Sequence, residues 1–191
     1  MLLASRSATR ARMLNAAGVP FQAIDVELDE RSLEQPFHGD ASELALALAQ
    51  TKALAAPAGT SLVLGSDQTL ELDDVRLLHK AADAREAAAQ LRAMSGRRHR
   101  LHAAAVLVEN GAVLWRGVES VTMHMRPLSD AFIADYLAAE WETVRWSVGC
   151  YHLEGRGAQL FDRVEGSHFA VLGLPLLPLL AELRELGFLT S

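Results

Sequence analysis

Hydrophobic and polar residues alternate with two different periods along the N-terminal half of the chain. Residues 1–4 are mostly apolar and predict a short strand. Ser7 can cap a helix that runs to about residue 17, where Gly18 ends it. Residues 21–26 alternate as a half-buried strand does. The pattern therefore predicts a strand, a helix and a second strand in that order.

A second helix and a buried strand follow. Asp40 and Glu43 form the sequence pattern of a capping box and predict a helix over residues 41–56. Residues 62–64 predict a short buried strand, and the following Gly-Ser pair is typical of a point where a strand ends. We therefore expect Asp67 at a strand end, facing a cleft.

The C-terminal half is richer in strands. Asp83 and Glu86 predict a second capping box and a helix that ends near Met94. Asn110-Gly111 is a strong hairpin signal between two alternating segments. The remaining predicted elements are strands over 101–108, 112–125, 159–164 and 168–172, and helices over 130–139 and 176–186.

Length and composition predict a compact globular protein over residues 1–191, as one domain or two closely joined lobes without a linker. The chain has 191 residues, of which 50% are hydrophobic, so it can bury a substantial core. No apolar run is long enough to cross a bilayer, and the N-terminus lacks the pattern of a secretory signal. A single cysteine, Cys150, excludes an internal disulfide. We expect a cytoplasmic protein without a membrane partner.

The charge distribution argues for a small anionic ligand and against nucleic acid. The formal net charge is −6, whereas binding to a phosphate backbone depends on clustered Lys and Arg. Of the 18 basic residues 16 are Arg, and the two lysines are Lys52 and Lys80. Lys is a compact charge that can approach one phosphate oxygen, so an ammonium group is a candidate requirement at both positions. Chance in an Arg-rich chain is the alternative.

Three candidate groups could carry chemistry. The carboxylate of Asp67 can hold a metal ion or accept a proton from water, or it can simply bond its own backbone. Arg10 lies in the first turn of the first helix, whose free N–H groups suit phosphate, but it could equally lie on a solvated face. Glu30 lies in an acidic turn. The patterns of zinc peptidases, acyl hydrolases and haloacid-type phosphatases are absent from the sequence.

Several short segments together resemble the Maf family, the nucleoside triphosphate pyrophosphatases also described as septum formation inhibitors. Each segment is weak alone, and their order and spacing make the combination specific. The matching segments are residues 3–10 (LASRSATR), Glu30, 49–53 (AQTKA), 65–68 (GSDQ), Lys80, 94–96 (MSG), 153–155 (LEG), 165–167 (EGS) and 173–176 (GLPL). The chain departs from the first family motif at Ala8-Thr9, where Pro-Arg is usual.

The resemblance implies an α/β fold with a mixed, bent sheet, flanking helices and a cleft between two lobes, similar to the inosine triphosphate pyrophosphatases. It implies hydrolysis of a nucleoside triphosphate to the monophosphate and pyrophosphate with a divalent cation, Mg²⁺ or Mn²⁺. The implied catalytic residues are Asp67, Lys52, Lys80, Glu30 and Arg10, with Asp67 and Glu30 holding the metal. The implied substrate-binding residues are Ser5, Ser7, Thr9, Gln68 and Glu154.

Substrate choice and the role of the protein leave alternatives. Gln68 together with Glu154 resembles the branch of the family that acts on 7-methylguanosine triphosphate, since a carboxylate can accept the paired N1–H and N2–H donors of guanine. A Glu154 that only bonds loop amides is the alternative. A nucleotide-binding regulator of cell division with little turnover is the alternative function, and a homodimer is left open.

Overall fold

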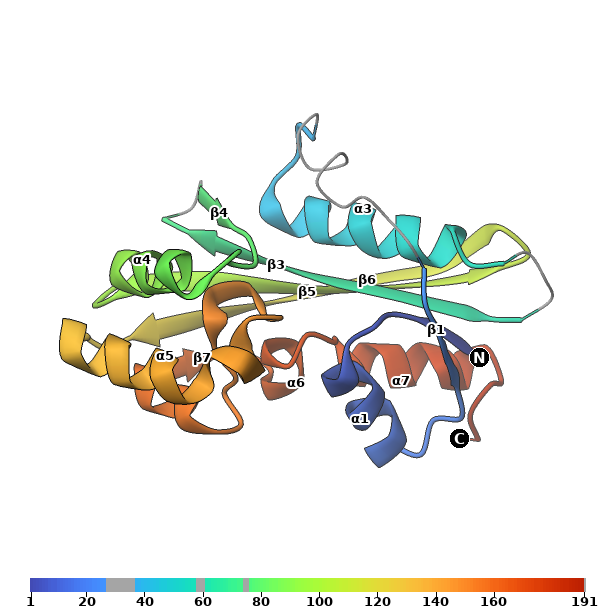
Figure 1. Ribbon diagram of the computed structural model, residues 1–191. Coiled ribbons are helices and arrows are strands. Elements are labelled where there is room, and N and C mark those ends of the chain that lie inside the picture. The colour runs from blue at the N-terminus through green and yellow to red at the C-terminus, as the bar shows by residue number, and fades with distance from the viewer. Residues whose placement is uncertain (27–36, 58–60, 74–75, 191) are drawn as a thin grey trace. The chain divides into compact units, whose positions relative to one another are not determined.

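The computed structural model describes residues 1–26, 37–57, 61–73 and 76–190 (Figure 1). Within these residues the chain forms a mixed sheet of seven strands with flanking helices, which confirms the predicted fold class. The strands, in spatial order, are β2 (Gln22–Ile24), β1 (Leu2–Ala4), β3 (Val63–Leu72), β5 (Arg98–Glu109), β6 (Ala112–Met125) and β7 (Phe161–Glu165), with β4 (Arg76–Leu78) paired to β3. The α-helices are α1 (Ala8–Ala16), α3 (Ala41–Leu54), α4 (Ala84–Met94), α5 (Asp130–Val144), α6 (His168–Val171) and α7 (Leu176–Glu185).

Strand directions follow from the connections. β1 runs parallel to both β2 and β3, and helices lie between these strands in the sequence, as parallel pairing requires. β4 is antiparallel to β3, and β7 is antiparallel to β6. Asn110 and Gly111, with φ of 50° and 76°, form the turn between β5 and β6, which confirms the predicted hairpin.

Residue contacts divide the chain into two compact units. The first contains Met1–Gln68, His102–Glu119 and Ser167–Ser191, and the second contains Thr69–Leu101 and Ser120–Gly166. The predicted arrangement of two lobes around a cleft remains a prediction. No helix in the described parts of the chain is both long and apolar enough to cross a membrane.

In the first unit, strand alternation divides the core between two helix layers. Leu3 and Leu64 point to the face covered by α1 and α7, where Leu14, Leu179 and other apolar side chains join them in one buried cluster. A neighbouring residue in each strand belongs to the opposite cluster: Ala4, which follows Leu3, and Val63, which precedes Leu64, pack with alanines of α3. Figure 1 shows α3 on one side of the sheet and α1 and α7 on the other.

Small residues let α3 lie very close to β3. Ala45, Ala49 and Ala53, spaced four apart, form the buried stripe of this helix. A Cβ at Gly65 would meet the carbonyl oxygen of Ala49 and would lie 2.7 Å from the nitrogen of Ala53. Glycine at this position is therefore required by the close approach of the helix backbone.

In the second unit, α4 and α5 pack against each other. Ser129 caps α5, and Ile133, Tyr136 and Leu137 are buried, whereas Phe132 is only partly buried. α5 continues to Val144, well beyond the predicted end at residue 139. The capping box predicted for α4 is only half formed, because Glu86 accepts a hydrogen bond from the backbone of Ala82 instead of Asp83.

Two predictions about local structure were wrong. The segment predicted as a strand over residues 168–172 contains the short helix α6 instead, since a five-residue apolar run does not distinguish a strand from a buried helical turn. The predicted strand end before Asp67 is absent, because β3 continues from Val63 to Leu72. The reason is that Gly65 makes room for α3 without breaking the strand, and Ser66 donates its hydroxyl to the carbonyl of Ala104 on the neighbouring strand.

Candidate active site

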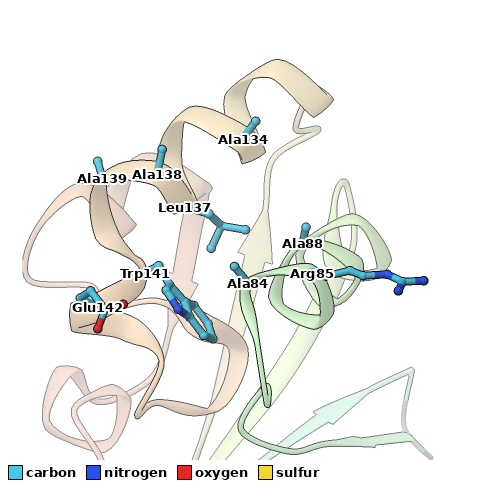
Figure 2. A pocket seen from close by; sticks show the side chains of 9 residues that line it. All are labelled: Ala84, Arg85, Ala88, Ala134, Leu137, Ala138, Ala139, Trp141 and Glu142. Atoms are coloured by element: carbon cyan, nitrogen blue, oxygen red, sulfur yellow. The ribbon is translucent and has the colours of Figure 1, made fainter.

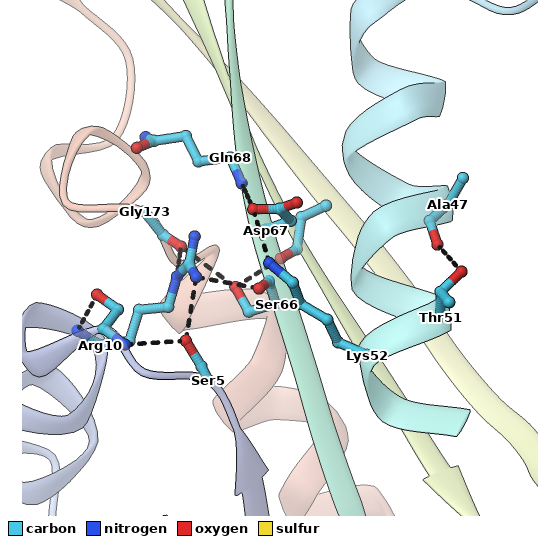
Figure 3. A network of polar contacts seen from close by, with 11 residues as sticks. Ser5, Arg10, Ala47, Thr51, Lys52, Ser66, Asp67, Gln68 and Gly173 are labelled. Atoms are coloured by element: carbon cyan, nitrogen blue, oxygen red, sulfur yellow. Dashed lines mark hydrogen bonds and ion pairs between the residues drawn. The ribbon is translucent and has the colours of Figure 1, made fainter. Parts of the chain in front are cut away.

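Asp67 lies in the middle of β3 and forms an ion pair with Lys52 of α3 (Figure 3). Val63, Gly65 and Asp67 alternate onto the face of the strand that α3 covers. Lys52 Nζ lies 3.3 Å from Asp67 Oδ1, and the side chains are only 13% and 11% exposed. The backbone N–H of Gln68 donates to the same Oδ1 at 2.9 Å. The sequence-predicted carboxylate and one predicted lysine are therefore in direct contact.

The close packing of α3 explains why this pair forms. Lys52 is next to Ala53 in the last turn of the helix, and Ala53 lies against Gly65. Asp67 is two residues beyond Gly65 on the same face of the strand, so the lysine side chain reaches it directly. A cation in the last turn also interacts favourably with the helix dipole.

A second polar network lies on the other face of the same strand segment, where Ser66 and Gln68 point (Figure 3). Arg10 is 8% exposed and donates from Nε to the carbonyl of Gly173 at 2.7 Å and from Nη1 to the carbonyl of Ser66 at 3.0 Å. The Ser66 hydroxyl also lies within 3.3 Å of the Gly173 carbonyl. The Gln68 amide nitrogen donates to the carbonyls of Ala170 and Val171 at 2.9 and 3.1 Å.

The predicted substrate-binding hydroxyls surround the start of α1. Ser7 is the N-cap and accepts from the backbone N–H of Arg10 at 3.3 Å. Ser5 Oγ accepts from the backbone of Ser7 and from Arg10 Nη1. Thr9 Oγ1 accepts from exposed Arg12. The structure therefore brings Ser5, Ser7 and Arg10 together, with Thr9 one position before Arg10 on the same helix.

Among the described residues, the carboxylate of Asp67 can bind a divalent cation. The two contacts of Asp67 described above both use Oδ1, which leaves Oδ2 to bind a cation. Mg²⁺ commonly uses one or two protein carboxylates together with water and substrate phosphates. Glu30, the second predicted metal ligand, lies outside the described residues, and in the rest of the chain no group of three or more His, Cys, Asp or Glu residues is arranged to hold a metal.

The two other predicted site residues belong to the second unit. Lys80 follows β4 and is exposed. Glu154 is also exposed and lies just before Gly155, whose φ of 153° allows the chain to turn between two short 3₁₀ helices, Val148–Cys150 and Arg156–Leu160. Gly157 packs so closely on the backbone of His152 that a Cβ there would meet its carbonyl oxygen. The backbone segments on either side of Glu154, at His152 and Gly157, therefore lie against each other.

Buried titratable groups of the second unit are kept neutral. Burial raises the pKa of the Cys150 thiol to about 11, which agrees with its expected weakness as a nucleophile. Burial, with a smaller effect of His124, lowers the pKa of His99 to about 4. His99 Nε2 lies 2.7 Å from the hydroxyl of buried Tyr151. These groups stabilise the core and offer no charge to a ligand at neutral pH.

A cavity of about 560 Å³ lies between α4 and α5 (Figure 2). Its walls include Ala84, Ala88, Leu137 and Trp141, with Arg85 and Glu142 at its rim. None of the predicted site residues is among the nine described residues that line it. Trp141, whose position the sequence did not predict, is part of α5.

Three residues of the Asp67 region were not predicted as site residues. They are Gly65, Ser66 and Gly173. Gly173 has a φ of 97°, and a Cβ there would lie 3.4 Å from the Arg10 guanidinium and 3.5 Å from Gln68 Oε1. Gly65 and Gly173 both fall in segments that resemble the family motifs. The motifs therefore contain both glycines, but they do not indicate why glycine is needed there.

Comparison with known proteins identifies the class. The family model described as Maf-like protein matches residues 1–186, so the chain belongs to the Maf family. A 7-methyl-GTP pyrophosphatase of Rhizobium meliloti is 50% identical, and the match covers 98% of this chain and 96% of that protein. A nucleoside triphosphate pyrophosphatase of Sphingopyxis alaskensis is 47% identical, with 98% and 97% covered.

Solved structures of other proteins align with part of this chain. The crystal structure of a dITP/XTP pyrophosphatase from Mycobacterium abscessus aligns with 66% of this chain and 74% of that chain, at 19% identity and a TM-score of 0.40. At that level of similarity nothing further follows from it.

Proposed function

We propose that this protein hydrolyses a nucleoside triphosphate to the nucleoside monophosphate and pyrophosphate. The observation that carries the proposal is the contact between Asp67 and Lys52, a nearly buried carboxylate and ammonium on β3 and α3, which carry two of the family motifs. Relatives that match almost all of this chain bear the names of pyrophosphatases, which supports the same reaction. Water adds to one phosphorus atom of the anhydride between the α- and β-phosphates, and the bond to the bridging oxygen breaks.

Asp67 is the general base in this proposal. It accepts the proton of the attacking water while its Oδ1 is held by the N–H of Gln68. Because the side chain lies on a strand packed on both faces, its position changes little between the free and bound protein. The carboxylate is therefore preorganised for proton transfer.

Positive charge near Asp67 offsets the charge of the triphosphate. Lys52 can exchange its contact with Asp67 for a phosphate oxygen, since an ammonium has three donors on a flexible stem. The N-terminus of α1, capped by Ser7 and flanked by Ser5 and Thr9, offers backbone N–H groups to phosphate oxygens. Lys80 supplies a second ammonium in the proposal.

A divalent cation, Mg²⁺ or Mn²⁺, fits the remaining oxygen of Asp67, and Glu30 is its second proposed ligand. When bound, such a cation would neutralise phosphate charge and lower the pKa of a bound water. Asp67 would hold the cation through Oδ2, since its two described contacts both use Oδ1.

A guanine-type base, in particular 7-methylguanine, is the proposed specificity. The exposed carboxylate of Glu154 can accept two neighbouring N–H groups of guanine, and the positive charge added by N7-methylation favours the same carboxylate. The name of the 50%-identical relative, 7-methyl-GTP pyrophosphatase, supports this choice.

Product analysis on a substrate panel tests the function. The purified protein is incubated with GTP, 7-methyl-GTP, ATP, dTTP and UTP in the presence of Mg²⁺ or Mn²⁺, and pyrophosphate and orthophosphate are measured separately. We expect pyrophosphate and monophosphate in equal amounts, with the highest kcat/KM for a guanine-type substrate. Release of orthophosphate with a diphosphate, or no turnover of any triphosphate, contradicts the proposal. A parallel purification from cells that do not express the protein reports activity from contaminants.

A further inference from the structure

The end of α6 and the turn that follows it are attached to β3 by the side chains of three residues. Arg10 Nε and Ser66 Oγ both approach the carbonyl of Gly173 (Figure 3). Gln68 bonds the carbonyls of Ala170 and Val171. We call the segment Ala170–Gly173 the anchored turn. Arg10 also bonds the carbonyl of Ser66, so one guanidinium joins the anchored turn to the residue that precedes Asp67.

The direction of the Arg10 side chain limits what it can contact. Its Nε donates to the carbonyl of Gly173, and its Nη1 donates to the carbonyl of Ser66 and to Ser5 Oγ. These partners fix the fork of the guanidinium between the strand and the anchored turn. Ser66 and Gln68 point away from the face that carries Asp67 and Lys52, because neighbouring residues of a strand point to opposite faces.

Gln68 is oriented in the same way. Two carbonyl oxygens surround its terminal amide, and only the NH₂ group can donate to both, so Nε2 must face Ala170 and Val171. The backbone N–H of Gln68 meanwhile donates to Asp67 Oδ1. The residue before Asp67 and the residue after it are thus both fixed by the anchored turn.

We propose that Arg10 and Gln68 are positioning residues, which hold β3 and the anchored turn together and thereby set the position of the Asp67 carboxylate. In this proposal neither side chain contacts the reacting atoms, which replaces the catalytic role that the resemblance implies for Arg10 and the substrate contact that it implies for Gln68. The proposal rests on the proposed function for its kinetic consequences, but its structural part can be tested without turnover. A displacement of a catalytic group by about 1 Å can reduce the rate by about 100-fold, so a positioning role has a measurable cost.

Kinetics separate positioning from direct contact with phosphate. We expect Arg10→Lys and Gln68→Met to lower kcat by at least about tenfold while KM and the inhibition constant of pyrophosphate change less than about twofold. Their double variant is expected to lose little more than either alone, since both act through one turn. Arg126→Lys is the matched control, because Arg126 bonds two carbonyls, of Gln159 and Pro127, in the same way as Arg10.

Hydrogen exchange tests the structural part in the free protein. The backbone N–H groups of Gly173 and Leu174 bond within the α6 region, to Ala170 and Phe169, and their exchange reports opening of the anchored turn. We expect exchange at least about tenfold faster in Arg10→Lys and in Gln68→Met, with unchanged circular dichroism, and no change in Arg126→Lys. Gln68→Met provides the same test if Arg10→Lys does not fold.

Two outcomes overturn the proposal. Unchanged exchange of the anchored turn in both variants shows that they do not fix it. A large rise in KM and in the pyrophosphate inhibition constant of Arg10→Lys, with kcat unchanged, shows that Arg10 binds phosphate directly. If the wild-type protein releases no pyrophosphate from any triphosphate, the proposed function fails while the exchange result still decides whether the turn is anchored.

Discussion

The two lysines of this chain lie in contrasting surroundings. Lys52 is almost covered, lies on a helix that rests on the backbone of β3, and contacts Asp67. Lys80 follows a three-residue strand, and Glu154 lies in a loop; both residues are exposed. The first region is fixed by packing on both faces of a strand, whereas the second presents side chains to solvent.

This difference suggests a division of tasks. A reaction centre must hold its groups within a fraction of an ångström, which packed helices and strands can do better than loops. Recognition of one base among several tolerates adaptable side chains on loops. We therefore expect changes around Asp67 to act mainly on kcat and changes at Glu154 to act mainly on the choice of substrate.

The largest effect is expected for Asp67→Asn. The amide keeps the shape of the side chain but can no longer accept a proton or hold a cation, so kcat should fall by at least about 100-fold with nucleotide affinity largely kept. Asp162→Asn, an exposed change on β7, is the matched control. If Asp67→Asn keeps a third of wild-type kcat, Asp67 is not the base.

Exchange of each lysine for arginine is expected to have the next largest effect. Lys52→Arg and Lys80→Arg preserve charge but replace a compact ammonium by a planar fork, and each should lower kcat/KM by at least about tenfold, as the loss of one charge-assisted contact of about 1.5–3 kcal/mol predicts. The reverse exchange Arg92→Lys, at an exposed ion pair with Asp130, should leave activity unchanged. Wild-type activity in both lysine variants would mean that the two lysines persist by chance.

A methyl group at Gly65 tests the packing that brings Lys52 to Asp67. We expect Gly65→Ala to lower the free energy of unfolding by about 1–3 kcal/mol, measured in urea, and to reduce kcat several-fold, because α3 must move away from β3. Gly18→Ala isolates the cost of backbone strain, since Gly18 has a φ of 69° and empty space around it. It should lower stability with unchanged kcat. Equal kcat in the two variants would show that the close approach of α3 does not matter for turnover.

The smallest change in rate, and the largest in selectivity, is expected for Glu154→Gln. An amide presents both a donor and an acceptor and matches the mixed edge of uracil or thymine better than guanine. The ratio of kcat/KM for 7-methyl-GTP to that for UTP should fall several-fold, with total activity largely kept. A wild-type protein that already prefers dTTP or UTP tenfold contradicts this role for Glu154 and leaves the pyrophosphatase proposal intact.

Much of the fold follows from local rules that the sequence displays. Ser7, Asp40 and Ser129 cap helices as predicted, and the Asn110-Gly111 turn forms because both residues tolerate a positive φ. These features depend on residues close together in the chain. The length of β3 could not be predicted in this way, because the reason for Gly65 is a helix backbone that lies next to it only in the folded protein.

The sequence predicted which residues belong to the site better than it predicted how they are arranged. The family motifs brought Asp67 and Lys52 together, and the structure places them in contact. The motifs do not indicate that Ser66 and Gln68 point away from Asp67, because that follows from an uninterrupted strand, whereas the Gly-Ser pair predicts a strand end there. Two partners of Arg10, at Ser66 and Gly173, are backbone carbonyls, which any residue type can supply, and so the sequence does not indicate them.

The hydrogen bond between Arg10 and Gly173 joins positions 163 residues apart. While the protein is being synthesised, the hairpin of β5 and β6 can form from neighbouring residues, but this bond must wait until almost the whole chain has left the ribosome. A nascent chain that already contains Asp67 and Lys52 therefore lacks the contacts that fix them. Activity should appear late and abruptly during synthesis, and shortened chains that end before α6 should bind nucleotide poorly even where their strands have formed.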